Sequence, residues 1–348
     1  MKYKLLGKSG LRVSELCLGT MTFGEDWGWG ASKDESRAVF EAFAAAGGTL
    51  IDTANMYTNG SSETITGELI SSDRDRYVLA TKYTFPDNPT SPANAGNPNA
   101  AGNQRKNLMR SVEGSLKRLG TDYIDLLWLH AWDFMTPVDE VMRGLDDLVS
   151  MGKIGYVGIS DAPAWVVAQA NTLAEWRGWT PFVALQIEYS LVERTPERDL
   201  IPMAEAFGLT VTPWSPLGQG ILTGKYNGDT KAEGTRLTGD GNRFVNERNL
   251  AIAQTVVEVA AEIGKTPSQV ALAWLLAQGP NVIPILGSRK AHQLEDNLGC
   301  LEVSLTPAQM QTLDEASKIT LGFPHEFLAG PLLRGGVTAG NDDSIIKR

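Results

Sequence analysis

Four residues with side chains suited to proton transfer lie at or just after the ends of three apolar segments of this chain. Asp52 and Tyr57 belong to GTLIDTANMY, Lys82 ends RYVLATK, and His130 ends YIDLLWLH. Because barrel enzymes carry their catalytic groups at the carboxyl ends of the strands, we expect these side chains to meet at one site. A free phenol has a pKa near ~10, and a neighbouring ammonium favours the phenolate and lowers that value. The four residues therefore predict a tyrosine acid assisted by a lysine.

The other two residues complete this arrangement. Asp52 would hold Lys82 by a charge-assisted hydrogen bond, and His130 would offer a second donor to orient a carbonyl oxygen. Taken singly, each residue has an ordinary explanation as a turn cap, a surface aromatic, a solvated strand end or a core histidine. Their joint occurrence favours the catalytic interpretation, in which the group polarises a carbonyl.

The elements that must position these residues alternate along the chain. After a predicted hairpin formed by YKLL and LRV come eight short apolar runs: ELCLG, GTLID, RYVLATK, YIDLLWLH, GYVGIS, FVALQIEY, LTVTPWS and VIPILG. The stretches between them, such as NLMRSVEGSLKRLG, are apolar on one helical face and charged on the other. Continuous apolar runs suit parallel strands that are covered on both faces. The pattern predicts a (β/α)8 TIM barrel with an N-terminal β-hairpin.

No linker divides the chain, so we expect residues 1–348 to form a single domain with a core over about 12–318 and a tail over 319–348. Asp34, Asp139 and Thr306 are predicted to cap helices, and Gly120 to end one. Three segments exceed what a barrel needs: the polar stretch 86–103, the stretch from Pro216 to about Asn249, and the tail. We expect the first to be a long mobile loop, and all three to lie over the carboxyl-terminal face.

Composition narrows the class of protein. A chain of 348 residues, 42% hydrophobic and 21% charged, has the material for a large soluble core. The net charge of -10 is repelled by phosphate backbones and anionic lipid, so neither nucleic acid nor a membrane is expected as a partner. We expect a small-molecule substrate instead. Two cysteines and three histidines are too few for a disulfide framework or a convincing metal site. Without a signal-peptide pattern, we expect a cytoplasmic protein, and the sequence favours no particular oligomeric state.

Several motifs together resemble one family. GGTLIDTANMY resembles the G-x-x-x-[IL]-D-T-A-x-x-Y signature of the aldo-keto reductase superfamily. The resemblance extends over nearly the whole chain, through LGTMTFG with Thr20, Lys82, the Leu129-His130 pair, GIS, Gln186, WSPLGQGILTGKY and GSRKAHQLEDN. It implies an NADP(H)-dependent oxidoreductase that reduces aldehydes or ketones to alcohols, or runs in reverse, with Tyr57 as the proton donor. The alternative is a regulatory or sensor subunit that binds the coenzyme with little turnover, resembling potassium-channel beta subunits.

The resemblance also implies which residues contact NADP(H). Ser160 and Gln186 would bind the nicotinamide carboxamide, Trp214 would stack on its ring, and the loop after Trp214 would bind the pyrophosphate. Arg289, with its neighbours, would bind the adenosine 2'-phosphate. The full set of implied coenzyme residues is Thr20, Ser160, Gln186, Trp214, Ser215, Leu217, Gly220, Lys225, Gly287, Ser288, Arg289, Gln293, Asp296 and Asn297. Each assignment has an alternative. Trp214 could serve packing alone, the loop after it could be a surface turn, and Arg289 could be a charge at the start of a helix.

The sequence departs from the family pattern at one coenzyme position. The family commonly has Ser-Asn after the fifth strand, whereas this chain has Ser160-Asp161. An amide both donates and accepts hydrogen bonds, but an ionised carboxylate only accepts. Asp161 would therefore bind only the carboxamide nitrogen, or turn away from it.

Aromatic residues on the predicted loops are the candidates for the substrate pocket. Trp27 and Trp29 follow the first strand, Trp132 follows His130, and the tail carries Phe323 and Phe327. Aromatics over a barrel suit an apolar or aromatic carbonyl substrate, and loop anchors packed on neighbours are the alternative.

Overall fold

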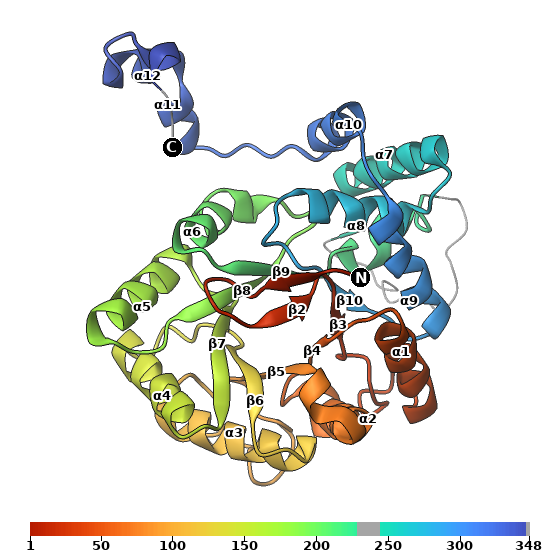
Figure 1. The fold of residues 1–348 in the computed structure, drawn as a ribbon, viewed down its shortest axis with the longest axis vertical. Coiled ribbons are helices and arrows are strands. Elements are labelled where there is room, and N and C mark those ends of the chain that lie inside the picture. The colour runs from red at the N-terminus through yellow and green to blue at the C-terminus, as the bar shows by residue number, and fades with distance from the viewer. Residues whose placement is uncertain (228–243, 346–348) are drawn as a thin grey trace.

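A barrel of eight parallel strands forms the centre of the computed structural model, which describes residues 1–227 and 244–345 (Figure 1). The strands run in the order β10-β3-β4-β5-β6-β7-β8-β9. Their bounds are β3 Cys17–Gly19, β4 Leu50–Asp52, β5 Val78–Tyr83, β6 Ile124–Leu129, β7 Ile154–Ser160, β8 Phe182–Glu188, β9 Thr210–Trp214 and β10 Ile285–Gly287. Each of the eight apolar runs overlaps one of these strands, so the predicted (β/α)8 barrel is confirmed.

The barrel closes next to β10 rather than along it. Val211 in β9 forms a parallel bridge with Val282, and its amide donates to the carbonyl of Asn281 at 2.8 Å. The amide of Ile283 donates back to Val211 at 2.9 Å. Residues 281–283 thus join β9 to the segment that continues into β10, which pairs with β3.

The predicted hairpin covers the amino-terminal end of the barrel. Strand β1 (Tyr3–Leu5) pairs antiparallel with β2 (Arg12–Ser14), and the hairpin lies across the barrel in Figure 1. Its residues Leu6 and Val13 are fully buried among the interior side chains of the barrel strands. Gly7 has φ +56° and lies so close to the carbonyl of Val183 that a Cβ would be 2.1 Å from that oxygen. Only glycine fits this turn.

Helices alternate with the strands and cover their outer surface. They are α1 Lys33–Ala45, α2 Ser61–Ile70, α3 Arg105–Leu119, α4 Val138–Ser150, α5 Ala164–Arg177, α6 Leu200–Phe207, α7 Glu247–Ile263, α8 Pro267–Ala277, α9 Ala291–Leu298 and α10 Pro307–Ser317. Their buried apolar faces and the outward side chains of the strands form the larger core cluster. None of the helices in the described part of the chain is both long enough and apolar enough to span a membrane.

Two of the predicted helix caps are confirmed, and two are wrong by two residues each. Thr306 caps α10, where its hydroxyl accepts from the amide of Gln309, and Gly120 ends α3 in the left-handed conformation. The residue before α1 is Ser32, with Asp34 in the first turn. Likewise Pro137 precedes α4, and Asp139 lies in its first turn. Acidic side chains are favoured both at the cap and in the first turn of a helix, so an aspartate near a helix start does not show which residue is the cap.

The polar segment 86–103 is attached to the barrel at several points, which differs from the mobile loop expected. Asp87 accepts from Arg118 of α3 at 2.9 Å, and Asn94 accepts from Arg110 at 3.0 Å. At the other end, the side-chain amide of Asn103 donates to Thr84 at 2.9 Å. Composition alone could not reveal these bonds, because their partners are ordinary helix residues. The second extra segment is described only in part, since residues 228–243 lie outside the described range.

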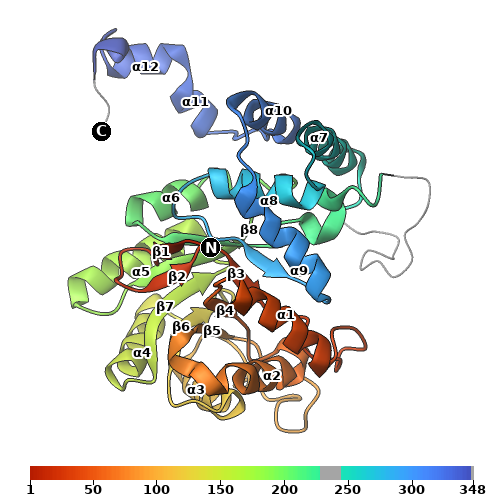
Figure 2. The same ribbon diagram turned by 45° about the vertical axis from the view of Figure 1, so that its right-hand side comes forward.

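The tail runs away from the barrel instead of covering its carboxyl-terminal face. Two short helices, α11 (His325–Ala329) and α12 (Pro331–Val337), extend beyond α10 and α6 (Figures 1 and 2). Phe323 and Phe327 contact each other at 6.0 Å between ring centroids, and Phe323 is 84% exposed. The structure therefore does not place these two rings in a substrate pocket. The root of the tail is held where Arg198 donates to the carbonyl of Thr320 at 2.8 Å.

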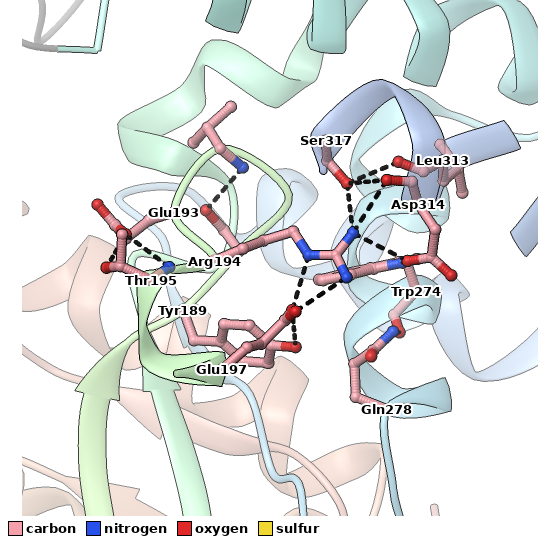
Figure 3. Close-up of polar contacts among 12 residues, drawn as sticks. Tyr189, Glu193, Arg194, Thr195, Glu197, Trp274, Gln278, Leu313, Asp314 and Ser317 are labelled. Atoms are coloured by element: carbon pink, nitrogen blue, oxygen red, sulfur yellow. Dashed lines mark hydrogen bonds and ion pairs between the residues drawn. The ribbon is translucent and has the colours of Figure 1, made fainter. Parts of the chain in front are cut away.

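A guanidinium joins the loop after β8 to the last helix of the barrel. Arg194 donates to both carboxylate oxygens of Glu197, at 2.7 and 3.0 Å, and to Asp314 of α10 at 3.0 Å (Figure 3). It also lies over the ring of Trp274 in α8, whose indole donates to the same Asp314 carboxylate at 3.0 Å. Ser317 accepts a further bond from Arg194 at 2.8 Å. One side chain thus links α10, α8 and the loop that follows β8.

We expect Arg194→Ala to lower the free energy of unfolding by about 1–3 kcal/mol, because Glu197 and Asp314 would lose a shared partner whose own side chain is 12% exposed. Urea unfolding followed by circular dichroism measures the loss. The matched control is Arg143→Ala, which removes an i,i+4 pair with Asp147 at 2.8 Å. Arg143 has a side chain 54% exposed, against 12% for Arg194, so the control should lose no more than about 0.5 kcal/mol. Equal losses would contradict a special contribution from Arg194.

Candidate active site

The strand register brings Asp52, Lys82 and His130 to one side of the sheet. Asp52 pairs with Ala80 in β5, Lys82 pairs with Trp128 in β6, and His130 follows Trp128 by two positions. Because side chains alternate along a strand, all three share the orientation of Ala80 and Trp128. Those two residues belong to the cluster inside the barrel. The three functional side chains therefore point into the barrel at its carboxyl-terminal end.

Lys82 is the centre of the group. Its ammonium forms an ion pair with the Asp52 carboxylate, donates to the carbonyl of Thr53 at 2.8 Å and donates to the Tyr57 hydroxyl at 3.1 Å. The three ammonium hydrogens thus have three acceptors, and the lysine side chain is fully buried. Burial alone would lower the pKa of Lys82, but the Asp52 carboxylate and Tyr57 outweigh it and raise that pKa. Lys82 is therefore a permanent cation at neutral pH.

Tyr57 reaches the lysine from a turn with unusual backbone angles. It begins a 3-10 turn, Tyr57–Gly60, in which Thr58 and Asn59 have φ values of 46° and 55°. Thr58 is fully buried, and its hydroxyl donates to the carbonyl of Phe23 at 2.7 Å. Residues other than glycine are rarely found in this left-handed region, and such strain is concentrated at functional sites. The turn presents the phenol to Lys82.

The pKa of Tyr57 lies above its ordinary value, which corrects the net direction expected from the sequence. Burial raises the pKa most, Lys82 lowers it, and the negative charge of Asp52 raises it again. The effect of the lysine is present, as expected, but burial outweighs it. The phenol is therefore fully protonated at neutral pH, as a proton donor must be.

His130 faces the phenol as a neutral ring. Its ring centroid is 5.9 Å from that of Tyr57 and 5.0 Å from that of Phe85, in edge-on contacts. Burial, followed by the charge of Lys82, holds the pKa of His130 well below its usual range. The buried Nδ1 atom has no hydrogen-bond partner among the described residues. A neutral imidazole with an unsatisfied nitrogen can still donate one hydrogen bond to a substrate oxygen.

The resemblance implies that Gln186 contacts the carboxamide of the coenzyme, and Gln186 also contacts the tetrad, which is the group formed by Asp52, Tyr57, Lys82 and His130. Its side-chain amide donates to Asp52 at 3.0 Å, using the carboxylate oxygen that does not accept from Lys82. Strands β7 and β8 bring Ser160 and Gln186 into register as neighbours. The two residues thus lie side by side next to Asp52. Thr20, by contrast, is fully buried and bonds through its hydroxyl to the carbonyl of Asp52 at 3.1 Å, so it supports the end of β4.

The loop after β9 has the strained turns expected of a binding loop. Trp214 ends β9, and Ser215 and Gly220 have φ values of 49° and 97°. The ammonium of Lys225 lies near Gly220, since a Cβ there would be 3.1 Å from it. The amide of Gly220 donates to the carbonyl of Leu217 at 2.9 Å, within the loop. Lys225 therefore places a positive charge beside this turn.

The segment from Gly287 to Asn297 separates into two parts. Ser288 is buried, and no described residue bonds to its hydroxyl oxygen, which suits a site for a polar ligand. The Gln293 side chain accepts from the amide of Arg289 at 3.2 Å. Asp296 turns away to α8, where it accepts from Thr266 at 3.1 Å and from Gln269 at 3.2 Å, and Asn297 is buried. The structure thus groups Gly287, Ser288, Arg289 and Gln293 at the strand end and places Asp296 against a helix.

Aromatic rings surround the phenol. Trp27 lies 6.4 Å from Tyr57 edge-on and 5.5 Å from Trp29, measured between ring centroids. Phe85, which contacts the His130 ring, was not anticipated from the sequence, although its place three residues after Lys82 could have indicated it. Trp132 differs from these rings, because it lines an outer groove with Phe134, Met135 and Trp165 between α4 and α5.

One contact that the sequence did not suggest crosses the end of the barrel. The indole nitrogen of Trp214 donates to the Asp161 carboxylate at 3.1 Å. Asp161 thus turns toward the aromatic residue that ends β9. Among the described residues, no group of three histidine, cysteine or acidic side chains could hold a metal ion.

Comparison with known proteins agrees with this geometry. The Aldo/keto reductase family model matches residues 15–318. Norsolorinic acid reductase stcV of Emericella nidulans is 41% identical over 325 residues, covering 92% of this chain and 82% of that protein. The NADP(+) aryl-alcohol dehydrogenase of Phanerodontia chrysosporium is 38% identical over 339 residues, covering 91% and 86%. Aldo-keto reductase ausK of Aspergillus calidoustus is 38% identical over 336 residues, covering 94% and 85%. The chain therefore belongs to the aldo/keto reductase family.

Proposed function

We propose that this chain is an NADP(H)-dependent oxidoreductase that interconverts aldehydes or ketones with the corresponding alcohols. The observation that carries the proposal is the 3.1 Å bond from the Lys82 ammonium to the Tyr57 hydroxyl, inside a barrel of this family. The relatives whose names state a reaction are reductases and a dehydrogenase, and one name specifies NADP(+). These names favour an enzyme over a sensor subunit.

The proton chemistry follows from the tetrad. The bound coenzyme would supply or accept the hydride. Tyr57 donates its proton to the oxygen that becomes an alcohol, and the Lys82 ammonium stabilises the phenolate that remains. Asp52 holds Lys82 in place, and neutral His130 donates a hydrogen bond that orients the carbonyl oxygen. In the reverse direction the same phenolate removes the proton from an alcohol.

The coenzyme would be held by the ends of strands β7 to β10. Ser160 and Gln186 suit the carboxamide, Trp214 the nicotinamide ring and Lys225 the pyrophosphate. The buried hydroxyl of Ser288, which has no partner in the described part of the chain, suits a polar part of the same ligand, with Arg289 next to it in the sequence. Since the four catalytic candidates lie at or after the ends of β4 to β6 and these coenzyme groups at or after the ends of β7 to β10, we propose that the barrel works as one domain.

The surroundings of Tyr57 favour an aromatic substrate. Trp27, Trp29 and Phe85 present ring faces and edges around the phenol and imidazole. Offset or edge-on contacts between aromatic rings stabilise a planar ligand beyond simple burial. An aryl aldehyde or aryl ketone, reduced to its alcohol, fits this lining. The aryl-alcohol dehydrogenase among the relatives supports the same class.

Replacing the acid tests the proposal directly. Tyr57→Phe should bind NADPH within about twofold of the parent protein, yet lose ~10²–10⁴-fold in the rate of aryl aldehyde reduction, because only the proton donor is removed. Coenzyme binding is measured by calorimetric titration, and turnover by loss of NADPH absorbance. Tyr123→Phe is the matched control, since that hydroxyl donates to Asp75 on the outer surface. Near-normal turnover by Tyr57→Phe would contradict the assigned role.

The pH dependence of kcat/KM gives a second test. Because burial raises the pKa of Tyr57, the acid form persists beyond the ordinary phenol value, and reduction should decline only above pH ~10. Oxidation needs the phenolate, so its rate should rise as the pH approaches that pKa. The pKa of His130 is lowered, so neither direction should show a break near ~6.5. A decline of reduction through neutral pH would be inconsistent with Tyr57 as the donor.

Coenzyme preference can be tested at Arg289. Arg289→Leu should weaken NADPH binding by about 10- to 100-fold and leave NADH nearly unchanged, because a guanidinium bond to the 2'-phosphate is lost. Lys290→Met is the control, since it removes the same charge from a neighbour that is paired with Glu35. Calorimetric titration with both coenzymes measures the effect. Equal weakening of NADPH and NADH, or equal effects of the two variants, would refute the 2'-phosphate assignment.

A further inference from the structure

Asp161 is the first residue after β7 and is fixed by its backbone on both sides. Its amide donates to the carbonyl of Gln186 in β8 at 3.2 Å, and its carbonyl accepts from the amide of Trp132 at 3.3 Å. The φ angle of Asp161 is +44°, in the left-handed region that aspartate and asparagine tolerate better than most residues. The direction of the carboxylate is therefore set by the backbone, and the same direction would be available to asparagine.

The carboxylate bridges β7 and β9 across the end of the strand between them. One of its oxygens accepts from the indole nitrogen of Trp214 at 3.1 Å, over a sequence separation of 53 residues. The strand between them is β8, which carries Gln186. Trp214 is itself only partly buried and is followed by the strained residue Ser215. The hydrogen bond from Asp161 therefore restrains a ring that the barrel packing does not fully enclose.

The charge of Asp161 reaches the catalytic group. Burial is the main cause of the raised pKa of Tyr57, and the negative charge of Asp161 adds to that rise. Burial raises the pKa of Asp161 itself, and the hydrogen bond from Trp214 and the charge of Lys82 oppose that rise by favouring the carboxylate. The carboxylate is thus close enough to the tetrad to act on any charge that develops beside Tyr57.

We propose that the Asp161 carboxylate holds the Trp214 indole as one wall of the coenzyme pocket and gives that wall a negative charge, so that the site prefers the oxidised, cationic nicotinamide to the reduced, neutral one. The inference rests on the proposed function, because it requires the nicotinamide to lie against Trp214. It assigns Asp161 as a positioning residue that acts through the tryptophan, and it names the form of the coenzyme that the site favours.

The two effects of the carboxylate can be separated by substitution. Asparagine keeps an oxygen that accepts from the indole but carries no charge, whereas alanine removes both the acceptor and the charge. Trp214→Phe keeps a smaller aromatic wall and removes the donor. These three single variants, together with the double variant that combines Asp161→Ala with Trp214→Phe, separate the effect of the carboxylate on the position of Trp214 from the effect of its charge.

The charge is tested by the ratio of dissociation constants for NADP+ and NADPH, measured by calorimetric titration at low salt. Asp161→Asn should weaken NADP+ relative to NADPH by about threefold or more, because a unit charge near the ring acts on the cationic form alone. High salt should reduce the difference. A ratio equal to that of the parent protein would overturn the charge assignment.

Positioning is tested by a double-mutant cycle on NADPH affinity. Asp161→Ala and Trp214→Phe should each weaken NADPH by roughly 3- to 10-fold, as expected for loss of a partly accessible charged hydrogen bond. The double variant should bind NADPH within about twofold of whichever single variant binds it less tightly, since both changes remove the same bond. Asp161→Asn should restore most of the loss seen with alanine. Multiplicative losses in the double variant would overturn the role through Trp214, and would instead favour a separate bond from Asp161 to the carboxamide.

The control is Asp139→Asn, which removes an exposed carboxylate from the first turn of α4. It should leave both the ratio and the NADPH affinity as in the parent protein, and a shift like that of Asp161→Asn would overturn the inference. Circular dichroism confirms that each variant is folded. If the parent protein binds neither NADP+ nor NADPH, the proposed function fails. If it binds both and the Asp161 variants leave the ratio and the cycle unaffected, only this inference fails.

Discussion

The rest of the site depends on one buried ammonium and its three acceptors. Moving a charge out of water is costly, and the cost is offset only when the charge is paired and its hydrogens are bonded. For Lys82 the offset comes from the Asp52 carboxylate, the Thr53 carbonyl and the Tyr57 hydroxyl, all supplied by β4 and the turn after it. The same bonds that make the lysine tolerable inside the protein therefore fix the position of the phenol and keep the ammonium charged.

This arrangement is possible because of the stagger of a closed parallel barrel. Each strand is displaced relative to its neighbour, so that Asp52 is level with Ala80 and Lys82 with Trp128. Side chains from β4, β5 and the residue after β6 can then reach the barrel axis at increasing height without competing for space. Helices α2 and α3 pack on the outside of these strands, and the buried Glu63 of α2 pairs with Arg118 of α3 at 2.6 Å. The outer layer thus holds the register on which the inner geometry depends.

Much of this could be predicted because it is encoded locally. The eight strands are continuous apolar runs, and Asp52, Tyr57, Lys82 and His130 lie at or just after the ends of three of them. The apolar pattern and the positions of these residues in it were therefore enough to predict that their side chains meet. Features that depend on distant partners were not predictable. Asp87 and Asn94 meet arginines of α3, which gives a polar loop a fixed place, and the tail that was expected over the barrel extends away from it. The direction in which the pKa of Tyr57 is shifted depends on how deeply the phenol is buried, and the spacing of residues in the sequence does not reveal that depth.

The balance of charge around the phenol bears on the direction of the reaction. Lys82 contributes one positive charge, Asp52 and Asp161 contribute two negative charges, and Tyr57 and His130 are neutral at the pH where the protein would work. The pocket wall is therefore net negative before coenzyme binds, and oxidised nicotinamide brings the compensating charge, whereas reduced nicotinamide does not. A protein with asparagine after its fifth barrel strand would lack one of these negative charges. In the proposed role of Asp161, a carboxylate at that single position would stabilise the complex with oxidised coenzyme, which is the complex that begins alcohol oxidation and ends carbonyl reduction.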